Sequence, residues 1–194
     1  MKRLLQISIL LLFASCGSLI NTTNSIADEK FKLCSDIKYN KLVTEFEPVQ
    51  GKLMYKKNIH ALFENLLLRE NYLKEISKSG YVDLLNKVEQ KKIKPELLDK
   101  FLDELEFDPY SLFPASSYLS CYEYLFEQLK ILDKNDITSW QYKFVNTYNK
   151  FETSGDLGVN NNYIINALNQ IPEKEFNKIM YRKLFLDLIF RQLN

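Results

Sequence analysis

The stretch Leu184-Phe185-Leu186-Asp187-Leu188-Ile189-Phe190, close to the C-terminal end of the sequence, is apolar except for one aspartate. On an α-helix these side chains would cover most of the circumference, which is typical of a helix at the centre of its domain or of one covered by a partner. We favour the central position, and the sequence leaves the other open. The helix is expected to begin at Pro172, with Glu173 and Glu175 in its first turn.

Upstream of this stretch, apolar residues recur at intervals of three, four or seven, which predicts further amphipathic helices. The clearest series is Tyr118, Tyr122, Leu125, Leu129 and Leu132, with Cys121 at its edge and Ser116 or Ser117 as the N-cap. The other predicted helices are Asp28–Phe46, with a short strand over Leu42–Glu47 as an alternative, Lys52–Ser79 ended by Gly80, Tyr81–Lys92, one beginning at Pro95, Ile137–Thr153 capped by Asp136, and Tyr163–Asn169.

The composition supports an all-α fold. The chain holds only 5 glycines and 5 prolines, so it has few residues that favour turns. Long helices joined by short connections pack as antiparallel neighbours. We therefore expect about seven helices, arranged as an irregular antiparallel bundle or as a short solenoid of helical hairpins.

The N-terminal residues have the pattern of a secretory signal peptide. Met1-Lys2-Arg3 is basic, and Leu4–Ala14 is apolar apart from two polar residues. A membrane-spanning helix needs about 20 apolar residues, so this shorter run is not expected to be a permanent anchor. We therefore predict export from the cytosol.

Two processing sites compete after this leader. Leu12-Phe13-Ala14-Ser15-Cys16 resembles a bacterial lipobox. The resemblance implies cleavage before Cys16 and a lipid on its sulfur, and Gly17 after the cysteine implies transfer to the outer membrane. The favoured organisation is a signal peptide over 1–15, a flexible tether over 16–29 and a single helical domain over 30–194. The alternative is cleavage after Ala27, within Ser25-Ile26-Ala27, which would release a periplasmic or secreted protein.

Two further cysteines, Cys34 and Cys121, remain after either cleavage. Two cysteines in an oxidising compartment usually pair. We therefore predict a disulfide between them. The alternative is that both are small apolar side chains in separate helices.

The charge balance argues against nucleic-acid binding. The chain holds 26 Lys and Arg against 25 Asp and Glu, and the sequence contains no basic stripe that would follow a phosphate backbone. The expected partners are therefore another protein, and a membrane through the lipid at Cys16.

No group of residues in the sequence indicates a reaction, a metal or a cofactor. His60, the only histidine, could contact Glu64 one turn later, and we expect an ordinary surface or boundary position for it. The acidic residues Asp99, Asp103, Glu104, Glu106 and Asp108 fit a solvated helix face, and the loop Asp156–Asn160 lacks the closing glutamate of a calcium site.

We therefore predict a cell-envelope lipoprotein with a protein-binding or structural role, and not an enzyme. The alternatives are a soluble exported binder or inhibitor and, with less support, an envelope hydrolase that uses two carboxylates. The hydrolase requires a cleft that holds two acidic side chains with raised pKa values.

Overall fold

Helices make up the ordered elements of the computed structural model, which describes residues 23–46, 58–114, 118–153 and 162–194. No strand occurs in these residues, which confirms the all-α prediction, and the alternative strand is wrong for Leu42–Phe46 because they are helical. The first helix covers residues 23–46. It is followed by α2 (Ile59–Arg69), α3 (Lys78–Glu89), α4 (Glu96–Leu105), the 3-10 turn η2 (Tyr110–Leu112), α5 (Leu119–Glu123), the π-helix η3 (Tyr124–Gln128), α6 (Trp140–Thr153), α7 (Asn162–Gln170), α8 (Glu173–Phe176) and α9 (Ile179–Leu193).

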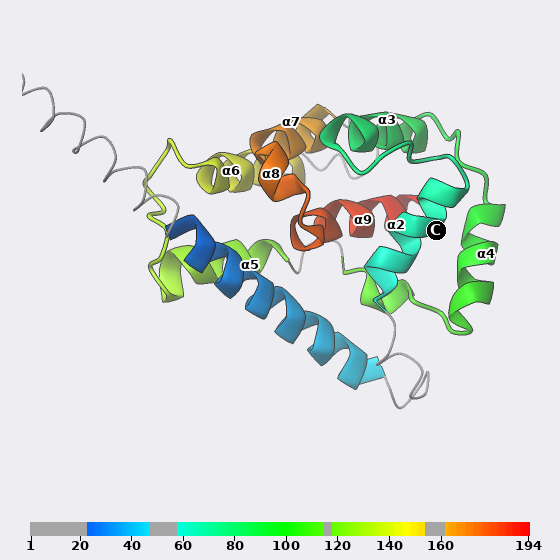
Figure 1. Cartoon of the computed structure of the whole chain (residues 1–194), viewed down its shortest axis with the longest axis horizontal. Helices are drawn as coiled ribbons and strands as arrows, with labels where there is room; N and C mark the ends of the chain where they lie inside the picture. Colours follow the sequence, from blue (N-terminus) through cyan, green and yellow to red (C-terminus); the bar gives the residue numbers. More distant parts are fainter. Residues whose placement is uncertain (1–22, 47–57, 115–117, 154–161) are drawn as a thin grey trace, which may run out of the picture.

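The C-terminal helix α9 lies at the centre of the domain. In Figure 1 it runs through the middle of the molecule, below the row formed by α6, α7 and α3 and above the 23–46 helix and α5. Helices α2, α3 and α8 contact it directly. Its residues are buried without interruption from Met180 to Phe190. The sequence left open whether this helix lies in the core or is covered by a partner. Its burial within the domain shows that it belongs to the core.

The first helix begins earlier than the predicted domain boundary at residue 30. Residues 23–29, which the sequence placed in the flexible tether, are helical, and Ala27 is only 1% exposed. The Tyr181 hydroxyl donates to the Asp28 carboxylate at 2.6 Å, which ties the same turn to α9. The part of the predicted tether that precedes residue 23 lies outside the described residues.

The single long helix predicted over Lys52–Ser79 is wrong. Its described part contains α2, a turn and the start of α3, because Asn71 adopts a left-handed conformation (φ 59°) after the last residue of α2. Asparagine tolerates this conformation better than most residues do. The chain then reverses so that Leu73 enters the core, and the apolar stripe continues across the turn without being helical there.

Gly80 does not end a helix, as the sequence suggested, but lies in the first turn of α3. Ser77 is the N-cap, and its hydroxyl accepts a hydrogen bond from the Gly80 amide at 3.0 Å. A Cβ atom at Gly80 would lie 2.2 Å from the Glu75 carbonyl oxygen and 3.3 Å from Leu73 Cδ1. A backbone atom cannot move aside as a flexible side chain can, so only glycine fits this position.

Gly80→Ala should therefore destabilise the protein by about 1 to 3 kcal/mol, the usual cost of an overpacked site. This result would be opposite in sign to the gain of about 1 kcal/mol that helix propensity alone predicts. Urea unfolding of the variant measures the difference. Glu89→Ala, at an exposed position at the other end of α3, is the control and should change the stability by less than about 0.5 kcal/mol. Equal or greater stability of Gly80→Ala would contradict this account of the turn.

Three other predicted helix ends differ from the structure. The helix expected to begin at Ile137 starts at Trp140, and Ser139 caps it by accepting from the Tyr142 amide at 3.2 Å, whereas Asp136 accepts from Thr138 in the preceding turn. The helix expected to begin at Pro172 is divided into α8 and α9. The series from Tyr118 to Leu132 runs through α5 into the π-helix η3, which ends at Gln128, so Leu129 and Leu132 follow the helix. The expected N-caps Ser116 and Ser117 lie outside the described residues.

Within the described residues, no helix is both long and apolar enough to cross a membrane.

Candidate binding groove and buried polar cluster

A groove of about 540 Å³ lies between the 23–46 helix and the beginning of α9. Asp28, Glu29, Lys32 and Asp36 line it from the first helix, and Asn58, the N-cap of α2, lies at its edge. These four residues share a side of the first helix because they follow one another at spacings of one, three and four. The wall thus presents both signs of charge.

The opposite side of the groove is the first turn of α9 and the residue before it. Lys178, Ile179, Met180 and Lys183 line this side. The aliphatic parts of Ile179 and Met180 give the groove an apolar portion between charged rims. An apolar surface with a few placed polar groups is the usual composition of a binding site.

Most of the charges at the rim are paired within the protein. Lys32 Nζ lies 2.6 Å from Asp36 Oδ2, and Lys178 forms ion pairs with Asp28 and Glu175. Pairing of this kind leaves no strong net field, so the groove does not select a highly charged ligand. The groove offers both polar and aliphatic side chains for contact.

Lys183 connects the groove with a buried polar cluster. Its side chain is 8% exposed, and its ammonium donates to Ser35 Oγ at 3.0 Å and lies 3.8 Å from Asp36 Oδ1. The ammonium also lies over the rings of Tyr39 and Tyr118, at 5.5 and 5.3 Å from their centroids. Burial lowers the pKa of Lys183, because the charged form loses its hydration.

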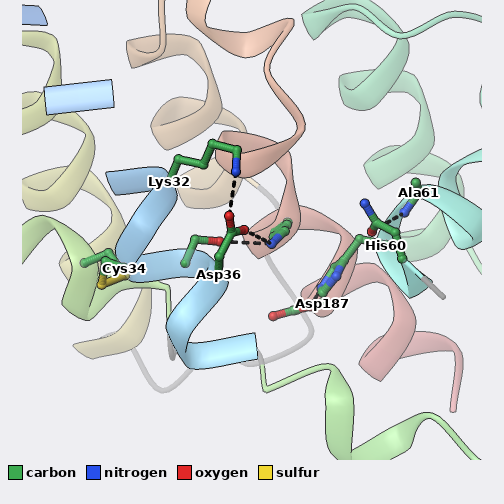
Figure 2. A network of polar contacts seen from close by, with 10 residues as sticks. Lys32, Cys34, Asp36, His60, Ala61 and Asp187 are labelled. Atoms are coloured by element: carbon green, nitrogen blue, oxygen red, sulfur yellow. Dashed lines mark hydrogen bonds and ion pairs between the residues drawn. A yellow bond between two sulfur atoms is a disulfide. The ribbon is translucent and has the colours of Figure 1, made fainter. Parts of the chain in front are cut away.

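The centre of the cluster is a contact between His60 and Asp187. His60 Nε2 lies 2.7 Å from Asp187 Oδ1, and both side chains are fully buried. Figure 2 shows the two side chains pointing at each other from α2 and α9. Burial lowers the pKa of His60 and raises that of Asp187, so the pair shares one proton. The surface or boundary position predicted for His60 is wrong, because its side chain is fully buried.

Several polar atoms around this pair have no hydrogen-bond partner within the described part of the chain. They are His60 Nδ1, Asp187 Oδ2 and the Tyr118 hydroxyl, all buried. The rings of Tyr39, Phe113 and Tyr118 surround the imidazole at 5.0 to 5.9 Å between centroids. The aromatic surroundings explain the desolvation of the pair. Among the described residues, no group of three His, Cys, Asp or Glu side chains is placed to hold a metal ion.

Glu64 binds Arg182 instead of His60, which corrects the contact expected from their one-turn spacing. Arg182 Nε and Nη2 donate to the two Glu64 oxygens at 2.7 and 3.0 Å, and Nη1 donates to the Phe176 carbonyl at 2.7 Å. The Tyr81 hydroxyl also donates to Glu64. Arg182 is 4% exposed and Glu64 is 3% exposed. This second pair fixes α2 against α9 with two parallel hydrogen bonds.

The His60–Asp187 pair predicts how the stability of the protein depends on pH. The raised pKa of Asp187 adds to the free energy of unfolding at low pH, and this contribution is lost as the pH rises. The lowered pKa of His60 adds to the free energy of unfolding above about pH 6.5, and this contribution is lost as the pH falls. Between about pH 4 and 6.5 the folded and unfolded pairs each hold one proton. Above that range the unfolded pair holds none, and the folded pair still holds one.

The free energy of unfolding should therefore fall as the pH rises above about 6.5, by at most about 1.4 kcal/mol per pH unit while the folded pair keeps its proton. His60 is the only histidine, so no other side chain of ordinary pKa titrates near pH 7, and burial raises the pKa values of the tyrosines further above this range. Lys183→Met serves as a second control, because burial lowers the pKa of this lysine. Urea unfolding at a series of pH values measures the slope. Asp187→Asn should abolish it and make the stability fall below about pH 6.5 instead. A flat profile for the native sequence across this range would refute the shared proton.

The other residues that the sequence singled out lie in separate parts of the structure. Cys34 and Cys121 lie at bonding distance, with sulfurs 2.09 Å apart and Cα atoms 5.8 Å apart, which joins the 23–46 helix to α5. Cys16 and the Asp156–Asn160 loop lie outside the described residues. In the acidic group, Glu104 pairs with Arg69 from α2. The carboxyls of Asp187 and Glu152 have raised pKa values because of burial, but neither lines the groove.

Sequence reasoning missed the groove and the two buried pairs. One signal pointed to the pairs: Arg182, Lys183 and Asp187 interrupt a helix that is otherwise apolar on all sides. Charged residues at such positions require buried partners. The partners themselves, 118 and 127 residues away in sequence for Arg182 and Asp187, have no sequence signal.

No family model, curated protein or solved structure matches this chain. A function for the protein therefore depends on the geometry described above.

Proposed function

We propose that the protein is an exported component of the bacterial cell envelope, tethered by a lipid on Cys16, whose helical domain binds a segment of another protein. The observation that carries the binding role is the groove between the 23–46 helix and α9. Its charged rims and aliphatic portion suit a polypeptide segment. The place of the tether, close before the helix that forms one wall, would present this groove near the membrane.

The pairing of Cys34 with Cys121 supports export. Disulfides persist in oxidising compartments such as the periplasm and are rare in the cytosol. The two sulfurs come from segments 87 residues apart and lie at bonding distance. Together with the basic and apolar leader, this geometry favours a protein that matures outside the cytosol.

The helical state of residues 23–29 supports processing at Cys16 over cleavage after Ala27. Cleavage after Ala27 would remove a side chain that is 1% exposed and would leave Asp28 as the first residue. Asp28 forms an ion pair with Lys178 and accepts from Tyr181, so the cut would fall inside a packed turn. Cleavage before Cys16 keeps these contacts. Radiolabelled palmitate should therefore enter the protein, and an N-terminus at Asp28 without label would refute the tether.

A pair of matched lysine variants tests the binding role. Lys32 and Lys41 lie on the same helix with exposed side chains (68% and 76%), and each pairs with a carboxylate four residues later. Only Lys32 lines the groove. After crosslinking and detergent extraction of the envelope fraction, Lys32→Glu should lose a stoichiometric protein partner that Lys41→Glu retains. Equal capture by both variants, or no partner with the native sequence, would refute binding in the groove.

A further inference from the structure

The first helix has a second apolar face that no described element covers. Ile26, Leu33 and Ile37 are 42%, 50% and 58% exposed. Steps of seven and four residues place these side chains on one side of an α-helix. The same spacing rules place Phe31 and Leu42, which pack into the domain, on the opposite side. We call Ile26, Leu33 and Ile37 the outer face.

Lysines lie beside the aliphatic residues of the outer face. Lys30 falls between Ile26 and Leu33 on the same side of the helix, and Lys41 follows Ile37 by one turn. Lys30 forms no ion pair with any other described residue, and Lys41 forms a loose exposed one with Glu45 at 3.7 Å. A helix with aliphatic residues on one face and lysines beside them binds at the interface of a bilayer, where each lysine stem lies along the apolar surface and its ammonium reaches the headgroup phosphates.

We propose that the outer face lies on the surface of the membrane that holds the lipid anchor. This inference rests on the proposed tether at Cys16. Seven peptide steps separate Cys16 from residue 23, so the helix begins within about 25 Å of the lipid-bearing residue. At that distance the effective concentration of membrane is high, and the outer face needs only weak affinity of its own to stay in contact.

A second copy of the chain fits the outer face less well. In a pair of helices Lys30 would be buried in the contact, where an ammonium without a partner is costly. The three side chains extend over only about 17 Å of helix at 1.5 Å per residue. A stable protein interface buries about 1,200 to 2,000 Å², which so short a contact does not supply. A lipid surface meets neither difficulty.

Tryptophan emission from the processed, lipidated protein tests the contact. Trp140 is the only tryptophan, so Trp140→Phe gives a protein without tryptophan emission. Leu33→Trp and, separately, Ile37→Trp are added to it, and the proteins are reconstituted in vesicles of phosphatidylethanolamine and phosphatidylglycerol, with or without brominated acyl chains. Both variants should lose most of their emission in the brominated vesicles. Ile76→Trp, at a position that is 38% exposed in the turn before α3, which lies across α9 from the first helix in Figure 1, is the control and should keep its emission.

The possible outcomes distinguish a failure of the membrane contact of the outer face from a failure of the lipid tether. Palmitate incorporation with equal emission in both kinds of vesicle would overturn the membrane contact while the tether stands. Unquenched emission together with crosslinks between copies would assign the outer face to self-association and overturn the proposal. Absence of palmitate would refute the tether. Quenching by vesicles added to the released protein would then support a membrane contact of the outer face by itself, and unquenched emission would overturn the contact together with the tether on which it depends.

Discussion

Replacing Arg182 by methionine should lower the free energy of unfolding by about 3 to 5 kcal/mol. The substitution leaves the Glu64 carboxylate at 3% exposure with Tyr81 as its remaining side-chain donor. It also removes the donor to the Phe176 carbonyl, which lies at the end of α8. A buried charge that loses its partner cannot regain its hydration, so the cost exceeds the strength of the ion pair itself. Urea unfolding followed by far-ultraviolet circular dichroism measures the change.

Two further variants test whether the loss of stability comes from the Glu64 carboxylate that remains buried without its partner. Glu64→Gln combined with Arg182→Met removes both charges and should recover a large part of the loss, since apolar replacement of a whole buried pair is often close to neutral. Arg69→Met breaks an exposed Arg–Glu pair, with side chains 58% and 39% exposed, and should cost less than about 1 kcal/mol. Similar losses for Arg182→Met and Arg69→Met would show that the buried pair has no special importance.

Loss of the link between Cys34 and Cys121 should have an effect of comparable size. The chain-entropy model assigns about 4 to 5 kcal/mol to a cross-link that closes a loop of this length, the two cysteines being 87 residues apart. The link joins the 23–46 helix to α5, and this helix also supplies one wall of the groove. Its loss should therefore loosen the groove as well as the fold.

The measurement compares the unfolding midpoint in urea with and without dithiothreitol, and repeats it for Cys34→Ser combined with Cys121→Ser. Dithiothreitol should lower the midpoint of the native chain and should leave the midpoint of the double variant unchanged, because the double variant has no link to reduce. Cys121→Ser also places a hydroxyl where the thiol is fully buried, so the double variant should be less stable than the reduced native chain, and the difference between these two midpoints measures that additional cost. Identical midpoints for the oxidised and reduced native chain would mean that the two cysteines do not form a covalent link in solution.

The helical pattern predicted more of the fold than of the site. Apolar periodicity located the helices and the central position of α9, because the period of the side chains is a local property of the sequence. It failed where the chain turns within an apolar stripe: Leu73 is buried like a helix-face residue, although Asn71 has already ended α2. Periodicity reports which residues are buried and does not report the direction of the backbone between them.

The candidate site depended more strongly on the tertiary structure. His60 and Glu64 lie one turn apart, and the spacing suggested that they contact each other. They instead pair with Asp187 and Arg182, respectively, both on α9. Both pairs form because α9 passes beside α2, and a buried charge binds the nearest buried partner rather than the nearest one in sequence.

The sequence by itself determined that this protein is helical, that its C-terminal helix is apolar on most sides and that its two downstream cysteines were candidates to pair. These are consequences of composition and of the spacing between neighbouring residues. Only the tertiary structure decided the groove between the 23–46 helix and α9, the partners of His60 and Glu64, and the side of the first helix that no described element covers. Each of these depends on which helices are adjacent, and long-range packing sets that arrangement rather than any local pattern.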